Sequence, residues 1–205
     1  VECHWVQDTG AVPLVADMSS NILSAPLDVS RYGLIYAGAQ KNLGPSGLTL
    51  VIVRRDLLGH ALPITPSVFN YQALDAQSSM VNTPPTFAIY IMGLVLAHVK
   101  ELGGVQAMAA HNERKAQLLY EFIDHSQLFT NRVAHEDRSR MNVTFFLKDE
   151  RLNDDFLKEA EQAGMVQLRG HRSVGGMRAS IYNAMPLESV MRLRDLMHRF
   201  EVAHR

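Results

Sequence analysis

Three short apolar runs near the start of the chain constrain its fold most strongly. They occupy residues 12–16, 34–37 and 48–53, and most of their side chains are aliphatic. Runs of this length are typical of β-strands, and their continuous rather than alternating apolar character is typical of a sheet that is covered on both faces. The chain is therefore expected to adopt an α/β fold that contains a mostly parallel sheet.

The part of the chain that follows is predicted to be helical. Thr83 is followed by two prolines, so we expect a helix with Thr83 as its hydroxyl cap and an end near Leu102. A double glycine at 103–104 interrupts the helical pattern, and a second helix is expected beyond it. We place a domain boundary at this double glycine, which separates residues 1–103 from residues 104–205.

The rest of the chain alternates between strand and helix patterns, which is typical of a small α+β domain. The expected elements are a strand at 142–147, a helix at 153–163, short strands at 166–168 and 177–182, and a last helix that begins at Leu187. A small C-terminal domain is therefore expected beside the first one.

The charge balance argues against an electrostatic partner. Twenty Lys and Arg residues against twenty-one Asp and Glu residues leave a formal net charge of −1. No bulk attraction to nucleic acid or to an anionic membrane is expected from this balance. Four basic residues of the second half are interpreted as solvated surface charges: Arg114, Lys115, Arg138 and Arg140.

Other features restrict the location and the type of site. The longest apolar stretch, at about 87–99, is too short to span a membrane, and the opening residues show no signal-peptide pattern. Cys3 is the single cysteine, which excludes an intrachain disulfide and favours a reducing compartment, so a cytoplasmic location is expected. The nine histidines show no metal-ligand spacing, and no metal is expected.

Lys41 and Asp17 are the first candidate site residues. Lys41 lies in a Gly-rich turn between two apolar runs, where a lysine is a candidate nucleophile, although a solvated loop lysine fits the same spacing. Asp17 ends an earlier run, and the carboxyl ends of strands in an open α/β sheet meet at one crevice. The alternative for Asp17 is a turn acid that accepts a hydrogen bond from the Ser19 or Ser20 amide.

A lysine and an acid at one crevice are the pair that pyridoxal phosphate requires. The lysine binds the cofactor aldehyde, and the carboxylate keeps the pyridine nitrogen protonated so that the ring accepts electrons. Spacing alone does not choose between this pair and the two structural alternatives.

Longer segments of the chain are more specific. They read ADMSSNILS at 16–24, DVSRYG at 28–33, YAGAQKNLGP at 36–45, VNTPPT at 81–86, SRMNV at 139–143 and GHRSVGGMRASIYNA at 170–184. These segments closely resemble the phosphoserine aminotransferase family, which belongs to the class V aminotransferases of pyridoxal phosphate fold type I. The resemblance covers nearly the whole chain from about Val15.

The resemblance implies a function and an assembly. It implies pyridoxal-phosphate-dependent amino transfer between glutamate and 3-phosphohydroxypyruvate, which gives phosphoserine for serine biosynthesis, in a cytoplasmic homodimer. Some members of the family also accept a phosphorylated hydroxythreonine in pyridoxine (vitamin B6) biosynthesis. The implied partners are therefore small-molecule substrates and a second copy of the chain, with no nucleic acid and no membrane.

The resemblance also assigns five residues to the cofactor. It implies that Lys41 is the catalytic lysine that holds pyridoxal phosphate covalently and that Asp17 pairs with the pyridinium nitrogen. Gln40 would contact the cofactor phosphate, and Asn82 and Thr83 would reach the cofactor phosphate of the neighbouring subunit. Thr83 keeps its alternative role as a helix cap.

Three further residues are implied to bind the substrate. His171 and Arg172 would bind its phosphate group, and Arg178 would bind its carboxylate, a task that suits a planar guanidinium. Without the resemblance, Arg178 is a charge at a strand edge and residues 170–176 are a flexible surface loop.

Some motifs of the family have no match in this chain, including a Gly/Ser-containing phosphate loop and an aromatic residue that stacks on the cofactor ring. The resemblance therefore implies the C-terminal portion of the enzyme, with a truncated large domain. Two alternatives are kept: an inactive fragment that acts as a folding or dimerisation module, and another class V enzyme such as a cysteine desulfurase. The second is disfavoured because Cys3 lies in a segment that diverges from the family.

Overall fold

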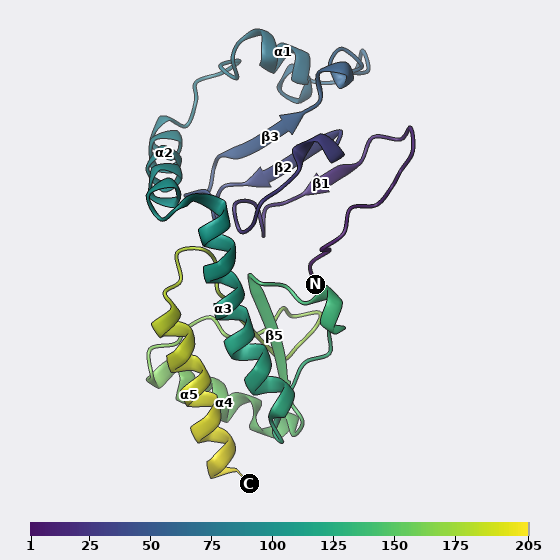
Figure 1. The fold of residues 1–205 in the computed structure, drawn as a ribbon. Coiled ribbons are helices and arrows are strands. Elements are labelled where there is room, and N and C mark those ends of the chain that lie inside the picture. The colour runs from purple at the N-terminus through teal and green to yellow at the C-terminus, as the bar shows by residue number, and fades with distance from the viewer. Residues whose placement is uncertain (205) are drawn as a thin grey trace. The chain divides into compact units, whose positions relative to one another are not determined.

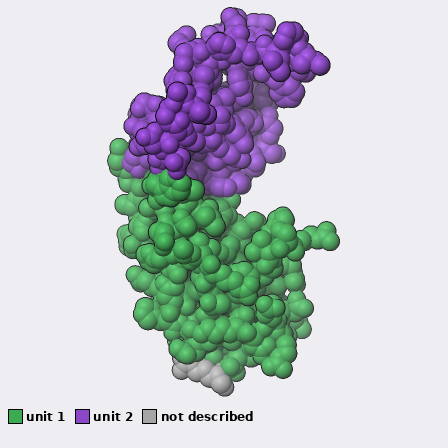
Figure 2. Space-filling model, turned by 90° about the vertical axis from the view of Figure 1, so that its right-hand side faces the viewer, with its two compact units in different colours: residues 1–5, 23–25, 103–205 green, residues 6–22, 26–102 purple. Residues whose placement is uncertain are grey.

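The structure is a computed structural model that describes residues 1–204, and the chain folds into two compact units. The N-terminal unit contains residues 6–22 and 26–102, and the C-terminal unit contains residues 1–5, 23–25 and the chain from residue 103 onward (Figure 2). The short segment 23–25 thus belongs to the C-terminal unit, although the residues on both sides of it belong to the N-terminal unit.

The N-terminal unit is built on a three-stranded sheet with the order β1-β2-β3 (Figure 1). Its strands are β1 (Val15–Asp17), β2 (Leu34–Gly38) and β3 (Thr49–Val53), which lie within one to three residues of the predicted positions. β1 runs parallel to β2, as expected, whereas β3 runs antiparallel to β2. The antiparallel pair arises because residues 39–48 form a connection shorter than the dozen or more residues that a parallel crossover needs.

Two α-helices and three short 3₁₀ helices complete the N-terminal unit. The α-helices are α1 (Tyr71–Ala76) and α2 (Thr86–Glu101), and the 3₁₀ helices are η1 (Val29–Arg31), η2 (Arg55–Leu57) and η3 (Ser67–Phe69). The predicted cap of α2 is wrong, because α2 begins at Thr86 with Pro85 as its N-cap residue and no side chain caps it. Thr83 lies two residues before this N-cap position.

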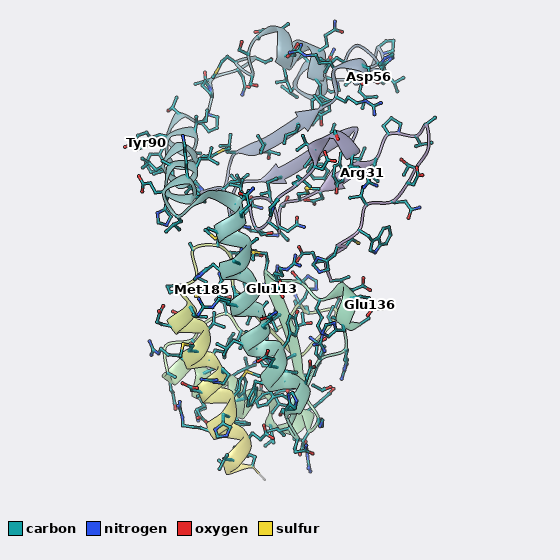
Figure 3. The ribbon with its side chains drawn as sticks, viewed as in Figure 1. Arg31, Asp56, Tyr90, Glu113, Glu136 and Met185 are labelled. Carbon is teal, nitrogen blue, oxygen red and sulfur yellow. The ribbon has the colours of Figure 1, made fainter. Side chains whose placement is uncertain are left out.

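The helix α2 exposes much of its apolar surface. Phe87 is 71% exposed and Tyr90, which projects from α2 in Figure 3, is 63% exposed, whereas Ala88 and Val99 are buried. Among the described residues no single helix is long and apolar enough to cross a membrane, and α2 and the helix that follows it, α3 (Gly104–His125), meet that criterion only when they are taken together as a bent pair.

The C-terminal unit is an antiparallel sheet with the order β4-β5-β6, packed against three α-helices. Its elements are α3 (Gly104–His125), β4 (Phe129–Thr130), η4 (His135–Asp137), β5 (Asn142–Leu147), η5 (Glu150–Leu152), α4 (Asn153–Gln162), β6 (Met177–Ser180) and α5 (Leu187–Ala203). The predicted strand at 166–168 is not formed. Gln167 has a φ of 62°, which breaks the extended backbone, and a single bridge joins Arg169 to Met177.

Aromatic side chains fill the core of the C-terminal unit. The rings of Phe129, Phe145, Phe156 and Phe200 are all nearly fully buried and come from β4, β5, α4 and α5. Their centroids lie between 5.2 and 6.5 Å apart in tilted and edge-to-face pairs, which are favourable aromatic geometries. This core joins the helices α4 and α5 to the sheet whose strand β6 carries Arg178.

Lys115 is not the solvated surface charge that the sequence suggested. It is completely buried on α3, and its Nζ donates hydrogen bonds to the carbonyl oxygens of Ile181, Tyr182 and Met185 at 3.0, 2.8 and 3.2 Å. Burial lowers the pKa of Lys115 to about 8. The prediction failed because the acceptors come from a turn far away along the chain, between β6 and α5.

Two of the other predicted surface charges form ion pairs. Arg138 binds both oxygens of Asp124 at 2.7 Å, and the Nε of Arg140 lies 2.5 Å from a carboxylate oxygen of Glu113, which projects from α3 (Figure 3). Arg114 is exposed, as expected.

Candidate functional site

Asp17 and Lys41 lie at the same edge of the N-terminal sheet. Asp17 is the last residue of β1, and Lys41 lies in the turn that follows β2, and these two strands are parallel neighbours. The carboxyl ends of parallel strands meet at one edge, which is why two residues far apart in the sequence approach each other here. The sequence predicted this juxtaposition from the ends of the two apolar runs.

Two consecutive serines contact this pair. The backbone N–H of Ser19 donates to Asp17 Oδ1 at 2.8 Å, and Lys41 Nζ donates to Ser20 Oγ at 2.6 Å. Ser19 Oγ in turn accepts a hydrogen bond from the N–H of Gly38, the last residue of β2, at 3.0 Å. The sequence interpretation treated Ser19 and Ser20 only as turn residues, because a Ser-Ser dipeptide gives no sign of partners about twenty residues away.

The surroundings of Asp17 favour its ionised form. Hydrogen bonds from the Ser19 hydroxyl and the Ser19 backbone, followed by the Tyr36 side chain and the positive charge of Lys41, hold the pKa of Asp17 below its usual value, with burial opposing them. Asp17 is therefore a turn acid, as the structural alternative proposed, and at the same time a carboxylate beside an ammonium group. The two roles are compatible.

A buried hydrogen bond of Asn42 holds the turn that carries Lys41 in place. Asn42 is buried, and its Nδ2 donates to the carbonyl of Ile22 at 2.9 Å, which ties the turn to the segment that follows Asp17. Lys41 itself is half-buried, and Gln40 is exposed. A β-carbon on Gly38 would lie 2.5 Å from Gln40 Oε1, so the Gln40 side chain packs over the end of β2 next to Ser19.

Asn82 and Thr83 belong to the same unit but do not join this cluster. Both lie in the exposed loop that precedes α2. Within the described residues, neither makes a hydrogen bond to Asp17 or Lys41.

His171, Arg172 and Arg178 belong to the C-terminal unit. His171 and Arg172 are exposed in the loop 170–176, where His171 Nδ1 lies 2.8 Å from Ser173 Oγ. The N–H of Gly170 donates to the Gly176 carbonyl at 2.8 Å, so hydrogen bonding closes the base of this loop. The loop is therefore a hydrogen-bonded turn with two exposed basic side chains.

Arg178 lies on β6 and lines a cavity of about 380 Å³. The loop 163–168, β6 and the first turns of α5 form the walls, and Arg192 is a second basic residue in the lining. Met185, which is labelled in Figure 3, accepts a hydrogen bond from Lys115 and also lines the cavity. The cavity lies within the C-terminal unit, and its lining does not include Asp17 or Lys41.

Among residues 1–204, no group of three or more His, Cys, Asp or Glu side chains is arranged to hold a metal ion.

A comparison with protein families identifies the group to which these residues belong. Residues 4–193 match the family described as "Aminotransferase class-V". The chain belongs to the class-V aminotransferase family. Solved structures of phosphoserine aminotransferases have the same α/β architecture as this chain. The predicted α/β fold of pyridoxal phosphate fold type I is therefore confirmed.

The similarity extends to individual class-V aminotransferases. The chain is 62% identical over 199 residues to "Phosphoserine aminotransferase" from Aromatoleum aromaticum, a match that covers 97% of the chain and 54% of that relative. Among solved structures, phosphoserine aminotransferase from Bacillus circulans subsp. alkalophilus superposes with a TM-score of 0.94 at 48% identity, covering 97% of the chain and 55% of that structure.

A third similar protein carries the cofactor. Phosphoserine aminotransferase from Trichomonas vaginalis, solved with bound pyridoxal phosphate, superposes with a TM-score of 0.89 at 42% identity, covering 94% of the chain and 55% of that structure. The chain thus spans about half the length of the relatives that it matches.

Proposed function

We propose that this chain is part of a phosphoserine aminotransferase, which uses pyridoxal phosphate to transfer the amino group of glutamate to 3-phosphohydroxypyruvate in serine biosynthesis. The observation that carries the proposal is the pair formed by Asp17 and Lys41, held at one sheet edge by Ser19 and Ser20. The names of the relatives at 58–62% identity support the choice of substrates.

The residues at the sheet edge fit pyridoxal phosphate. Lys41 offers an amine that can bind the cofactor aldehyde, and Asp17 offers a carboxylate whose lowered pKa keeps it ionised to pair with a protonated pyridine nitrogen. Gln40 precedes Lys41 in the chain, has its side chain against Gly38, and is proposed to contact the cofactor phosphate. When bound, the cofactor supplies an electron sink that stabilises negative charge at the substrate Cα.

The work of Lys41 is proton transfer. We assign its Nζ the removal of a proton from the substrate Cα and the delivery of a proton to C4′ of the cofactor, which is general acid–base catalysis by a positioned amine. Asp17 keeps its negative charge throughout, because its hydrogen-bond donors favour the ionised form. The turn held by Asn42 keeps the amine at the sheet edge.

Three basic residues of the C-terminal unit are proposed to bind the substrate. Arg178 lies in a cavity of about 380 Å³, where a guanidinium can bind both oxygens of the substrate carboxylate. The exposed side chains of His171 and Arg172 suit a phosphate dianion. In this proposal residues 1–103 are part of the large domain and residues 104–205 form the small domain.

The proposal includes a homodimer in the cytoplasm. The exposed apolar side chains of α2, including Phe87 and Tyr90, form a surface of the kind that a second copy covers. Asn82 and Thr83 precede this helix, where they are proposed to reach the cofactor phosphate of the partner subunit. The use of a phosphorylated hydroxythreonine in pyridoxine biosynthesis stays a prediction from the resemblance.

The decisive experiment measures cofactor attachment. For this experiment the chain is fused to the segment of the Aromatoleum aromaticum relative that lies outside the matched region. We call this fusion the completed protein. Pyridoxal phosphate is titrated into the completed protein and into the 205-residue chain, and the visible absorbance is recorded. We expect a Lys41-dependent band and amino transfer from glutamate in the completed protein.

The Lys41→Ala variant tests whether the visible band depends on Lys41. A band that persists in Lys41→Ala removes Lys41 from its role. Absence of both the band and amino transfer in the completed wild-type protein supports the alternative of an inactive folding or dimerisation module.

A further inference from the structure

We propose that Ser19 and Ser20 are positioning residues that hold Asp17 and Lys41 in place for the cofactor. This inference rests on the proposed function, since it concerns the same lysine and carboxylate. The two serines are neighbours in the chain, and each contacts one member of the pair. The dipeptide therefore fixes the two groups relative to each other before any cofactor binds.

Ser19 links the ends of two strands to Asp17. Its backbone N–H donates to Asp17 Oδ1 at 2.8 Å, and its hydroxyl oxygen accepts from the N–H of Gly38 at 3.0 Å. Ser19 thus contacts both strand ends, and the Gly38 N–H fixes the position of its hydroxyl. This hydroxyl is the largest of the contributions that lower the pKa of Asp17.

Ser20 fixes the position of the amine. Lys41 Nζ donates to Ser20 Oγ at 2.6 Å, a short contact for an ammonium and a hydroxyl oxygen. A lysine side chain has many rotamers, and one directed hydrogen bond selects among them. The amine is therefore held at the sheet edge whenever it is not joined to the cofactor, which includes the steps in which Lys41 moves protons.

The chain contains a matched arrangement that lacks these connections. At residues 28–30 the same Asp-x-Ser spacing recurs, and the Ser30 N–H and hydroxyl donate to Asp28 Oδ1 at 3.1 and 2.6 Å. That turn only starts the short helix η1 and contains no lysine. An Asp-x-Ser turn therefore does not by itself produce hydrogen bonds like those between Ser19 and Gly38 and between Ser20 and Lys41.

The test uses four variants of the completed protein. Ser19→Ala and Ser20→Ala remove the two hydroxyls, Ser20→Thr keeps one of them, and Ser30→Ala is the matched control. Two readouts that do not depend on turnover are recorded from the visible band: the rate of pyridoxal phosphate attachment to the cofactor-free protein, and the pH at which the cofactor is lost on acidification. Circular dichroism confirms that each variant is folded.

The expected results differ between the two serines. Ser20→Ala slows attachment by about tenfold, the effect of losing one hydrogen bond to a charged group, and Ser20→Thr restores the rate. Ser19→Ala loses its cofactor at a higher pH than wild type, because Asp17 without the hydroxyl is protonated earlier as the pH falls. Ser30→Ala matches wild type in both measurements.

The inference and the proposed function fail in different ways. If wild type acquires no band, the proposed function is overturned and the serines have nothing to position. If wild type acquires the band while Ser19→Ala and Ser20→Ala behave like Ser30→Ala, the function stands and the inference about the serines is overturned. A folded Ser20→Thr variant as slow as Ser20→Ala also counts against it, because the retained hydroxyl should rescue the rate.

Discussion

Asp17 and Tyr36 are paired in register across the parallel strands β1 and β2, and the Tyr36 side chain helps to lower the pKa of the Asp17 carboxyl group. In a sheet, residues in register on neighbouring strands present their side chains to the same face. A residue of the middle strand therefore supports the candidate acid from the side, while Ser19 supports it from the turn. The carboxylate is held by parts of the chain that are close only because the sheet has formed.

The first prediction concerns Tyr36. Removing the phenol in Tyr36→Phe takes away one of the contacts that lower the pKa of Asp17, so this pKa should rise. The rise should be smaller than in Ser19→Ala, because the Ser19 hydroxyl contributes more. Carboxyl ¹³C chemical shifts of Asp17 recorded against pH in the cofactor-free protein measure both effects. Equal titration curves for wild type and Tyr36→Phe would contradict this account of the contact.

The second prediction concerns the buried ammonium of Lys115. Lys115→Met removes the donor and leaves the carbonyl oxygens of Ile181, Tyr182 and Met185 without it, so the free energy of unfolding should fall by about 2–4 kcal/mol. Arg114→Met changes the neighbouring exposed residue and should shift it by less than about 0.5 kcal/mol. Urea unfolding of the 205-residue chain followed by circular dichroism makes the comparison. Equal midpoints for the two variants would show that the buried hydrogen bonds contribute nothing.

The third prediction is the pH dependence of that contribution. Burial lowers the pKa of Lys115 from 10.5 to about 8, so between these two values the unfolded chain binds a proton that the folded chain does not. The free energy of unfolding should therefore rise with pH across this window, whereas below about pH 8 the penalty for the buried charge is fully present. Urea unfolding at several pH values, with Lys115→Met as the reference, isolates the effect. A difference between the two proteins that is independent of pH would refute it.

Sequence patterns predicted the elements whose signals are local. The strand β5 was placed at its observed bounds, and the double glycine located the start of α3, because Gly103 and Gly104 both adopt positive φ values of 96° and 78° that few other residues favour. The pair Asp17 and Lys41 was also accessible, since both follow strand-like runs and strand ends converge in an open sheet. These elements were predictable because apolar runs, the positions of strand ends and the double glycine are all visible in the local sequence.

The remaining features depend on partners that are distant in the sequence. Lys115 is buried because three carbonyl oxygens from a remote turn replace water around its ammonium group, which no local pattern reveals. The roles of Ser19 and Ser20 depend in the same way on Gly38 and Lys41. The strand β4 has two residues, too few for any periodicity. His171 and Arg172 were assigned through the family resemblance alone.

The fourth prediction tests the loop that carries His171 and Arg172. A β-carbon on Gly170 would lie 2.1 Å from the Gly175 carbonyl oxygen, a distance that no real pair of these atoms adopts, so Gly170→Ala must open the base of the loop. In the completed protein we expect the KM for phosphoserine to rise by about tenfold or more, as the two basic side chains lose their positions. The Lys41-dependent band should be unchanged, because Gly170 does not belong to the unit that holds Lys41.

The matched control for this loop is Val174→Ala. Val174 is 62% exposed in the same loop, and shortening it creates no steric conflict, so its KM for phosphoserine should equal that of wild type. Steady-state kinetics with phosphoserine and, separately, with glutamate distinguish loss of phosphate binding from general damage, since glutamate has no phosphate group. If Gly170→Ala raises both KM values equally, the loop supports the fold of the C-terminal unit and the assignment of His171 and Arg172 to the substrate phosphate is wrong.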